Sequence, residues 1–258
     1  MEKLRLGGMA LANGVLVHGP TSWAAAVRTP EGEIKVGSGS KRRFAPNVEL
    51  PFVRGPLRLA EAFALLPDVR RALPEARFPF ERPRVVAAVV ASSTVAALAR
   101  RSSGSAGLRE AVAAIASIAP AMLALRGGEL ASYHGAEHVS IGTYESGEAA
   151  GKEHERCGSH LIGPLLASSA IASTLAAAAP KRLRTAARLA GSAGALSVAV
   201  EVFAWMTRHP DHPVAKALAR PGLELQRRLS TAEPSSEQLE VADAALRACL
   251  AAEHARTG

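Results

Sequence analysis

The sequence is poor in aromatic residues and in cysteine, and both shortages narrow the classes of protein it can encode. Only 4% of the 258 residues are aromatic although 48% are hydrophobic, so the apolar content is mostly alanine, leucine and valine. A soluble core built from such residues is short of bulky packing groups, whereas small side chains let membrane helices approach closely. Two cysteines cannot form a disulfide framework, which indicates a reducing environment around them.

The sequence also lacks a continuous basic stripe with interleaved aromatic residues, and this argues against nucleic-acid binding. The net charge is +8, but the basic residues stand in short groups beside apolar runs, as at 82–84, 100–101 and 181–184. Anionic lipid headgroups would meet basic side chains in these positions. We therefore expect membrane lipids, and no nucleic acid, as partners.

Four apolar stretches predict membrane helices. The stretches 85–99 and 111–125 hold 15 residues each, 161–179 holds 19, and 189–206 is apolar except for Glu201. A spanning helix needs about 20 apolar residues, so the last two qualify, and the first two are short unless their terminal arginines reach the headgroups. The alternative for the first two is a buried or half-inserted helix.

Extended structure precedes these stretches and helical structure follows them. The β-branched run 15–17, and the segments 24–28 and 34–36 around the turn residues 29–32, predict a β-hairpin. Apolar residues at helical spacing between 239 and 250 predict one or two surface helices. The expected fold is mainly α, with about four membrane helices. Its parts are an N-terminal cytoplasmic segment with a β-hairpin (1–84), membrane helices with a loop at 127–160 (85–206), and a helical C-terminal tail (207–258).

If all four stretches span the membrane, the three long segments share one side of it. The positive-inside rule does not choose that side cleanly, because the short connections at 100–107 and 180–188 are also basic. We place the long segments in the cytoplasm. No internal repeat is visible, and the composition is compatible with a homo-oligomer.

The motif Tyr133-His134-Gly135-Ala136-Glu137-His138 indicates a metal site. On a helix, His134 and His138 lie on one face and both imidazoles can reach one divalent ion, although Gly135 weakens that helix. Glu137 can accept a proton from a water molecule that the ion activates. This H-x-x-E-H order is that of the inverted zincins, which makes zinc the expected metal.

A second cluster follows at 153–160. Either His154 or Cys157 can complete a three-ligand site that leaves one position open. Cys157 can instead act as a thiolate nucleophile beside Arg156 and a histidine. The plainer interpretation is that His160 and one of the others form hydrogen bonds at the membrane interface.

Glu201 is a carboxylate within an otherwise apolar stretch, where an unpaired charge is costly. One interpretation makes it the third metal ligand, because inverted zincins take that ligand from a downstream glutamate. The other is a salt bridge to an arginine such as Arg188 or Arg208. A transporter that uses Glu201 as a proton relay is a weaker hypothesis, since the sequence shows no repeat.

These motifs together resemble the YqhQ-like family, bacterial proteins of unknown function described as predicted metal-dependent membrane proteins. The resemblance rests on residues 7–20, 51–55, 133–145, 154–159, Glu201 and 221–242. It implies a multi-pass protein of the bacterial inner membrane. Family members usually carry Gln and Glu where this chain has Met9 and Asn13, and Lys where it has Val139. If the family's N-terminal glutamate is a ligand or base, this chain has lost it.

The sequence therefore supports two main hypotheses. The first is a metal-dependent hydrolase at the membrane surface, acting on a peptide or lipid-linked substrate. Its ligands would be His134 and His138 with His154, Cys157 or Glu201, and Glu137 would be the general base. The second is a non-catalytic membrane scaffold or assembly factor, with a structural metal or a hydrogen-bonded histidine cluster.

Overall fold

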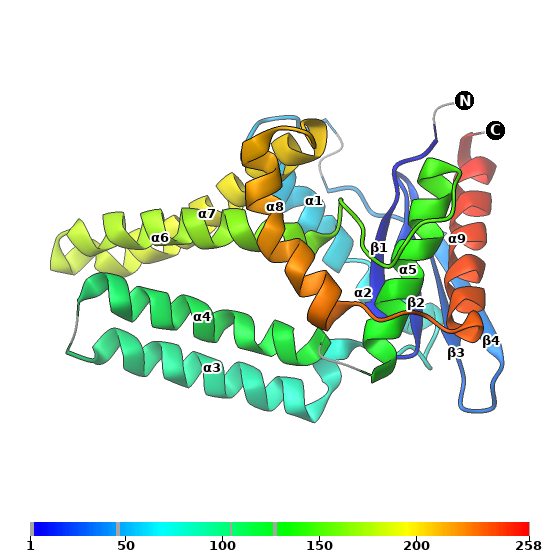
Figure 1. The fold of residues 1–258 in the computed structure, drawn as a ribbon, viewed down its shortest axis with the longest axis horizontal. Helices are drawn as coiled ribbons and strands as arrows, with labels where there is room; N and C mark the ends of the chain where they lie inside the picture. Colours follow the sequence, from blue (N-terminus) through cyan, green and yellow to red (C-terminus); the bar gives the residue numbers. More distant parts are fainter. Residues whose placement is uncertain (1–2, 45–46, 104, 126–127, 258) are drawn as a thin grey trace.

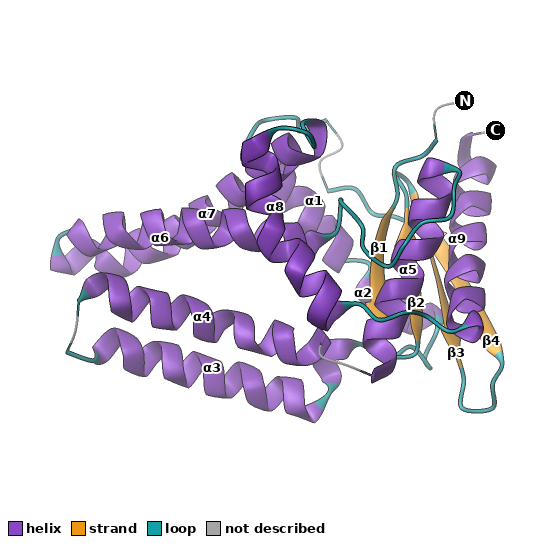
Figure 2. Ribbon diagram, in the orientation of Figure 1, coloured by secondary structure: helices purple, strands orange, loops and turns teal. Residues whose placement is uncertain are grey.

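The computed structural model describes residues 3–44, 47–103, 105–125 and 128–257. A small antiparallel sheet and the helices that cover it form one end of the molecule, which we call the sheet module. Two pairs of long helices, the helical arms, extend from it toward the opposite end (Figures 1 and 2). Both chain termini lie at the end of the sheet module.

The sheet contains β1 (Gly7–Leu11), β2 (Gly14–His18), β3 (Ser22–Arg28) and β4 (Ile34–Ser40) in that spatial order. Each strand pairs antiparallel with the next because the connections are short. The predicted two-stranded hairpin is therefore one half of a larger sheet. A hairpin alone buries too little apolar surface to be stable, whereas four strands offer two faces for packing.

Helices cover both faces of this sheet. One face packs against α5 (Gly128–Ser146) and α9 (Ser236–Thr257), where Val15 and Ala24 meet Tyr133 and Ala245. The other face packs against α2 (Leu66–Ala72) and its flanks. Since successive side chains of a strand point to opposite faces, burial on both sides explains why β2 and β3 read as continuous apolar runs.

The C-terminal helix α9 is part of this core. Val241, Ala242, Ala245 and Cys249 are fully buried against the sheet and α5. The predicted surface helices are thus replaced by one long core helix. Its small side chains carry a weak amphipathic signal, but they allow the helix to lie close to the strands.

The first arm pairs α3 (Pro83–Arg101) with α4 (Ala106–Leu125), and the second pairs α6 (Ile162–Ala178) with α7 (Arg184–Arg208). The turn within each arm lies at the end farthest from the sheet module (Figure 1). Between arms and module lie α1 (Arg54–Phe63), α8 (Pro213–Leu225) and a π-helical turn at Gln226–Ser230. Short 3-10 turns occupy Pro79–Glu81, Gly158–Leu161 and Lys181–Leu183.

Three helical segments in the described part of the chain are long and apolar enough to cross a membrane: Pro83–Arg101, Gly158–Ala178 and Lys181–Arg208. Between 11% and 17% of each apolar window is buried, so most of this surface is free to contact lipid. This corrects the predicted number of about four. The remaining helix, α4, combines a short apolar stretch with charges in its first turns, and several of its side chains lie outside the described set.

Candidate metal centre

Helix α5 carries His134, Glu137 and His138 and is itself buried in the sheet module. Gly135 sits where the helix meets the backbone of Ala232, and a Cβ there would overlap the carbonyl oxygen of Ala232. The glycine that weakens the helix by propensity is therefore required by this close approach. Packing against the 232 segment and the sheet compensates for it.

Both histidines of α5 are held by backbone carbonyl groups. The Nδ1 atom of His134 lies 2.7 Å from the oxygen of Ser230, and that of His138 lies 2.6 Å from the oxygen of Lys152. A carbonyl oxygen only accepts hydrogen bonds, so each Nδ1 carries a proton, and in a neutral imidazole Nε2 would then present the lone pair. This arrangement around metal-binding histidines fixes the tautomer and the ring orientation.

Cys157 completes a group of three ligand atoms. Its Sγ lies 3.5 Å from Nε2 of His134, and the ligand atoms of His134, His138 and Cys157 all lie within 4.8 Å of one another. Cys157 caps the 3-10 turn Gly158–Leu161, where its sulfur accepts a hydrogen bond from the backbone N–H of Ser159. Two imidazoles and one thiolate form a donor set that zinc prefers.

Glu137 stands beside these ligand atoms. Its Oε2 lies 3.9 Å from Nε2 of His134 and 3.6 Å from Nε2 of His138, beyond hydrogen-bond distance. The carboxylate fits there because β1 has a glycine opposite: a Cβ on Gly8 would overlap Oε1. Burial raises the pKa of Glu137 above that of a surface glutamate, which suits a group that accepts and returns a proton.

Burial also sets the protonation states of two ligands. It lowers the pKa of His138 to about 3, so its imidazole is neutral near neutral pH, the form that binds metal. Burial raises the pKa of the Cys157 thiol to about 11, so the thiol keeps its proton unless a cation displaces it. A free thiolate nucleophile at Cys157 is therefore disfavoured relative to a metal ligand.

His154 lies beside the three ligand atoms but is directed elsewhere. Its ring centre is 5.5 Å from that of His138, while its Nε2 lies 3.2 Å from a carboxylate oxygen of Glu145. Glu145 also forms an ion pair with Arg156. His154 and Arg156 thus hold the loop to α5 through one carboxylate.

Glu201 forms its hydrogen bonds away from the ligand atoms of His134, His138 and Cys157. Its carboxylate accepts two hydrogen bonds from Arg54, at 3.0 and 2.8 Å, and one from the backbone N–H of Phe52 at 3.1 Å. The arginine salt bridge that the sequence offered as an alternative is present, with Arg54 in place of Arg188 or Arg208. The structure thus brings together His134, Glu137, His138 and Cys157, and it does not bring Glu201 to them.

Gln226 organises the loop around the centre, a role that the sequence analysis missed. Its fully buried amide accepts a hydrogen bond from the backbone N–H of His154 at 2.8 Å and donates one to the hydroxyl of Ser159 at 2.8 Å. Its Nε2 also lies 3.0 Å from Nε2 of His160. Gln226 begins the π-helical turn that ends at Ser230, whose carbonyl orients His134. The one sequence signal for Gln226 is its place in the segment 221–242, which resembles the family pattern.

The two N-terminal departures from the family pattern fall away from the centre. Asn13 donates hydrogen bonds to the carbonyls of Arg28 and Glu75 and accepts one from the N–H of Arg77, at 3.0 to 3.1 Å. Met9 packs on the sheet face opposite to α5. Their side chains contribute to the sheet module and do not form part of the candidate metal centre.

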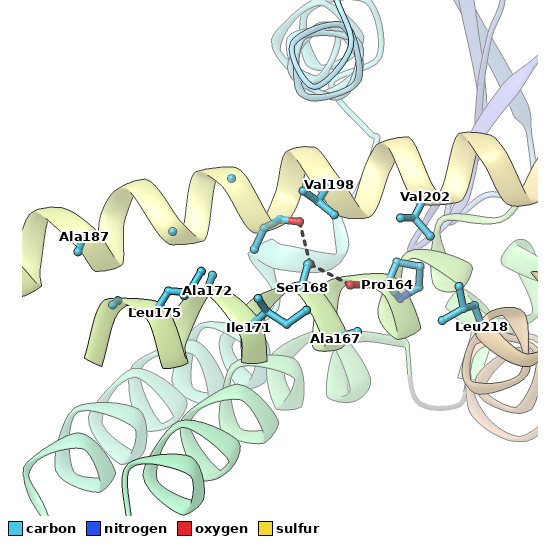
Figure 3. A pocket seen from close by; sticks show the side chains of 14 residues that line it. Pro164, Ala167, Ser168, Ile171, Ala172, Leu175, Ala187, Val198, Val202 and Leu218 are labelled. Atoms are coloured by element: carbon cyan, nitrogen blue, oxygen red, sulfur yellow. Dashed lines mark hydrogen bonds between the residues drawn. The ribbon is translucent and has the colours of Figure 1, made fainter. Parts of the chain in front are cut away.

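An apolar groove of about 560 Å³ runs between α6 and α7 (Figure 3). Its lining includes Ala167, Ile171, Leu175, Gly191 and Val198. The hydroxyl of Ser168 donates to backbone oxygens of both helices and holds them together. The residues that line the groove carry no titratable side chain, so this groove is separate from the centre.

Two comparisons with known proteins bear on this region. Residues 128–252 match a family described as "Protein of unknown function (DUF1385)". The "Uncharacterized protein YqhQ" of Bacillus subtilis (strain 168) is 36% identical over 118 residues, which cover 43% of this chain and 37% of that protein. Residues 128–252, just under half of the chain, thus resemble the DUF1385 family, and the chain is similar to YqhQ.

The DUF1385 region contains α5, the loop with Cys157, the π-helical turn and most of α9, and therefore every residue of the centre. The chain matches little more than a third of the length of its Bacillus relative. No solved structure matches the chain. The family has no assigned activity, so the function has to be argued from the geometry.

Proposed function

We propose that this chain is a metal-dependent hydrolase at the membrane surface, with zinc as its metal. His134, His138 and Cys157 are the ligands, and Glu137 is the general base. The observation that carries the proposal is the convergence of one nitrogen from each imidazole and the Cys157 Sγ within 4.8 Å, with both imidazoles oriented by carbonyl groups. Three protein ligands with an open fourth position are typical of catalytic zinc sites.

The groups around the centre have different roles in the proposed reaction. When bound, the ion would supply Lewis acidity and lower the pKa of water toward neutrality. Glu137 takes a proton from the attacking water and returns it to the leaving group, for which its raised pKa and its place beside both imidazoles are suitable. The N–H of Ser159 stabilises negative charge on the Cys157 sulfur.

The position of the centre in the chain supports a membrane-associated substrate. Cys157 is the last residue before the apolar segment Gly158–Ala178, one of the three candidate spans. The centre therefore lies close to where that helix would enter the bilayer. A peptide or lipid-linked substrate at the membrane surface fits this location, on the cytoplasmic side of the bacterial inner membrane.

Metal analysis tests the centre itself. We expect about one zinc per purified wild-type chain by mass spectrometry in detergent, and none in a His134→Ala/His138→Ala variant. The matched control is His254→Ala, which removes an exposed histidine of α9 and should keep the metal. Equal metal content in all three proteins would contradict the ligand assignment.

Kinetics test the general base. Fluorogenic peptides and simple esters serve as probes, and Glu137→Gln should keep the metal but lower the hydrolysis rate by about a hundredfold or more. The matched control is Glu155→Gln, an exposed acid of the neighbouring loop. Unchanged hydrolysis in the Glu137 variant would show that another group takes the proton.

One observation favours the second candidate, a non-catalytic scaffold with a structural metal. The ligand residues join α5 to the loop at 152–160, and hydrogen bonds link these two segments to the turn at 226–232, which is distant in sequence. An ion there would hold these segments together and stabilise the fold. Under this alternative, replacing any ligand lowers thermal stability and abundance together, and no turnover accompanies the bound metal.

A further inference from the structure

Large apolar side chains are exposed on α1 and in the segment before it. Phe44, Leu50, Phe52, Val53 and Phe63 are each 46% to 64% exposed, and we call these five residues the α1 patch. Single exposed apolar residues are common on protein surfaces, but a group of this size marks an interaction site. Three of the six phenylalanines in the chain belong to this patch.

The α1 patch is attached to a candidate membrane span. Gly55 of α1 lies against Val200 of α7, so closely that a Cβ on the glycine would overlap the valine side chain. Arg54 forms two hydrogen bonds with Glu201 of the same helix, at 3.0 and 2.8 Å. Figure 1 shows α1 between the second arm and the sheet module. The helix α1, which carries the patch together with the segment before it, is therefore fixed to a candidate span of the second arm.

The backbone at Phe52 is strained and is held by the same carboxylate. Phe52 has a φ of 67°, a left-handed conformation that is unfavourable for a bulky residue. Its N–H donates a hydrogen bond of 3.1 Å to Glu201. Strained backbone of this kind persists only where neighbouring groups fix it. The aromatic side chain on this backbone is 54% exposed.

We propose that the α1 patch inserts into the headgroup region of the bilayer that α7 enters, with the bilayer surface as its partner. The Glu201–Arg54 pair is the anchor that fixes α1 to the span. Aromatic and aliphatic side chains at the level of the lipid headgroups are typical of helices that lie in the membrane interface. Glu201, a carboxylate in a mostly apolar helix, thereby has a role that does not depend on the metal centre.

The charges of α1 indicate that this contact is apolar and does not need anionic lipid. Arg54 is paired with Glu201 at 2.8 Å and with Glu49 at 4.0 Å. Arg58 is paired with Glu61 at 3.0 Å and with Glu49 at 3.8 Å. Because these guanidinium groups are neutralised within the protein, lipid phosphates gain little from them.

Site-specific photo-cross-linking tests the proposal. The photoreactive residue p-benzoylphenylalanine replaces Phe52 or Phe63 in the full chain, reconstituted in vesicles of phosphatidylcholine with or without phosphatidylglycerol. Val36, 47% exposed on β4 of the sheet module, is the matched control position. We expect lipid adducts by mass spectrometry at 52 and 63 in both kinds of vesicle, and none at 36.

Other outcomes would overturn the proposal. Chain-to-chain adducts at 52 and 63 would identify the patch as a contact between two copies. Absence of adducts, or adducts only with phosphatidylglycerol, would exclude apolar insertion. The variant Glu201→Gln tests the role of the anchor independently of the patch. In this variant, lipid adducts should fall several-fold at position 52, and those at position 63 should be largely retained. Position 63 has ordinary helical backbone, so it tests the patch even if changes at Phe52 disturb folding.

Discussion

Replacing Gly135 with alanine should destabilise the protein although it improves helix propensity. A Cβ at this position would overlap the carbonyl oxygen of Ala232, which is backbone and cannot turn away. The 232 segment is held to α5 by the hydrogen bond from the N–H of Ala232 to the oxygen of Ala131, at 2.9 Å. The new methyl group therefore has to push the segment off the helix or distort the helix itself.

The expected change in the free energy of unfolding combines two destabilising effects and one stabilising effect. Overpacking in a tight contact costs about 1–3 kcal/mol, and the lost hydrogen bond costs about 1 kcal/mol. Alanine in place of glycine recovers about 1 kcal/mol of helix propensity. We therefore expect the free energy of unfolding to fall by about 1–3 kcal/mol. The neighbouring turn that orients His134 would move with the segment, so zinc affinity should fall as well.

Thermal unfolding of the full chain in detergent, with and without zinc, measures both effects. The matched control is Gly158→Ala in the cysteine loop, where nothing lies within 4 Å of a new Cβ. That variant should stay within about 0.5 kcal/mol of wild type. A Gly135→Ala variant as stable as wild type would refute the view that backbone contact with Ala232 dictates this glycine.

Three further predictions follow from contacts elsewhere in the chain. Gly8→Ala should displace the Glu137 carboxylate, which can rotate, so hydrolysis should fall about tenfold or more while metal content stays constant; unchanged rates would mean that this carboxylate is not positioned by β1. Arg54→Met should lower the free energy of unfolding because Glu201 loses its partner, and double substitution with Glu201→Gln should recover part of the loss. Burial lowers the pKa of His18 to about 4, below its unfolded value of 6.5, so its contribution is complete above pH 6.5 and about 3 kcal/mol is lost as the pH falls toward 4. A pH titration of thermal stability that is equally steep in wild type and in His18→Gln would contradict this assignment.

Local patterns in the sequence determined much of the architecture. The apolar stretches became the helices of the arms, because long runs of Ala, Leu and Val favour helices wherever their surface can meet lipid. The four-residue spacing put His134 and His138 on one face of α5, with Glu137 beside them, since helix geometry fixes that relation without help from the fold. These features depend only on neighbouring residues.

The tertiary structure decided which distant residues complete the centre. Cys157 joins the histidines and His154 does not, although both lie in one short loop, because Gln226 and Glu145 fix the path of that loop. Glu201 was a plausible ligand by sequence, yet Arg54 holds it at the junction of α1 and α7.

The sheet and the C-terminal helix also show features that depend on packing between distant segments. The strand pattern at 7–11 is weak because of its glycines, and those glycines are needed where β1 passes His18 and Glu137. Helix α9 joins the core because small side chains let it lie against the strands. The carbonyl groups of Lys152 and Ser230 that orient the imidazoles belong to the backbone, so no residue type signals them. Periodicity and spacing report on interactions between near neighbours, whereas pairings between distant segments depend on how the whole chain packs.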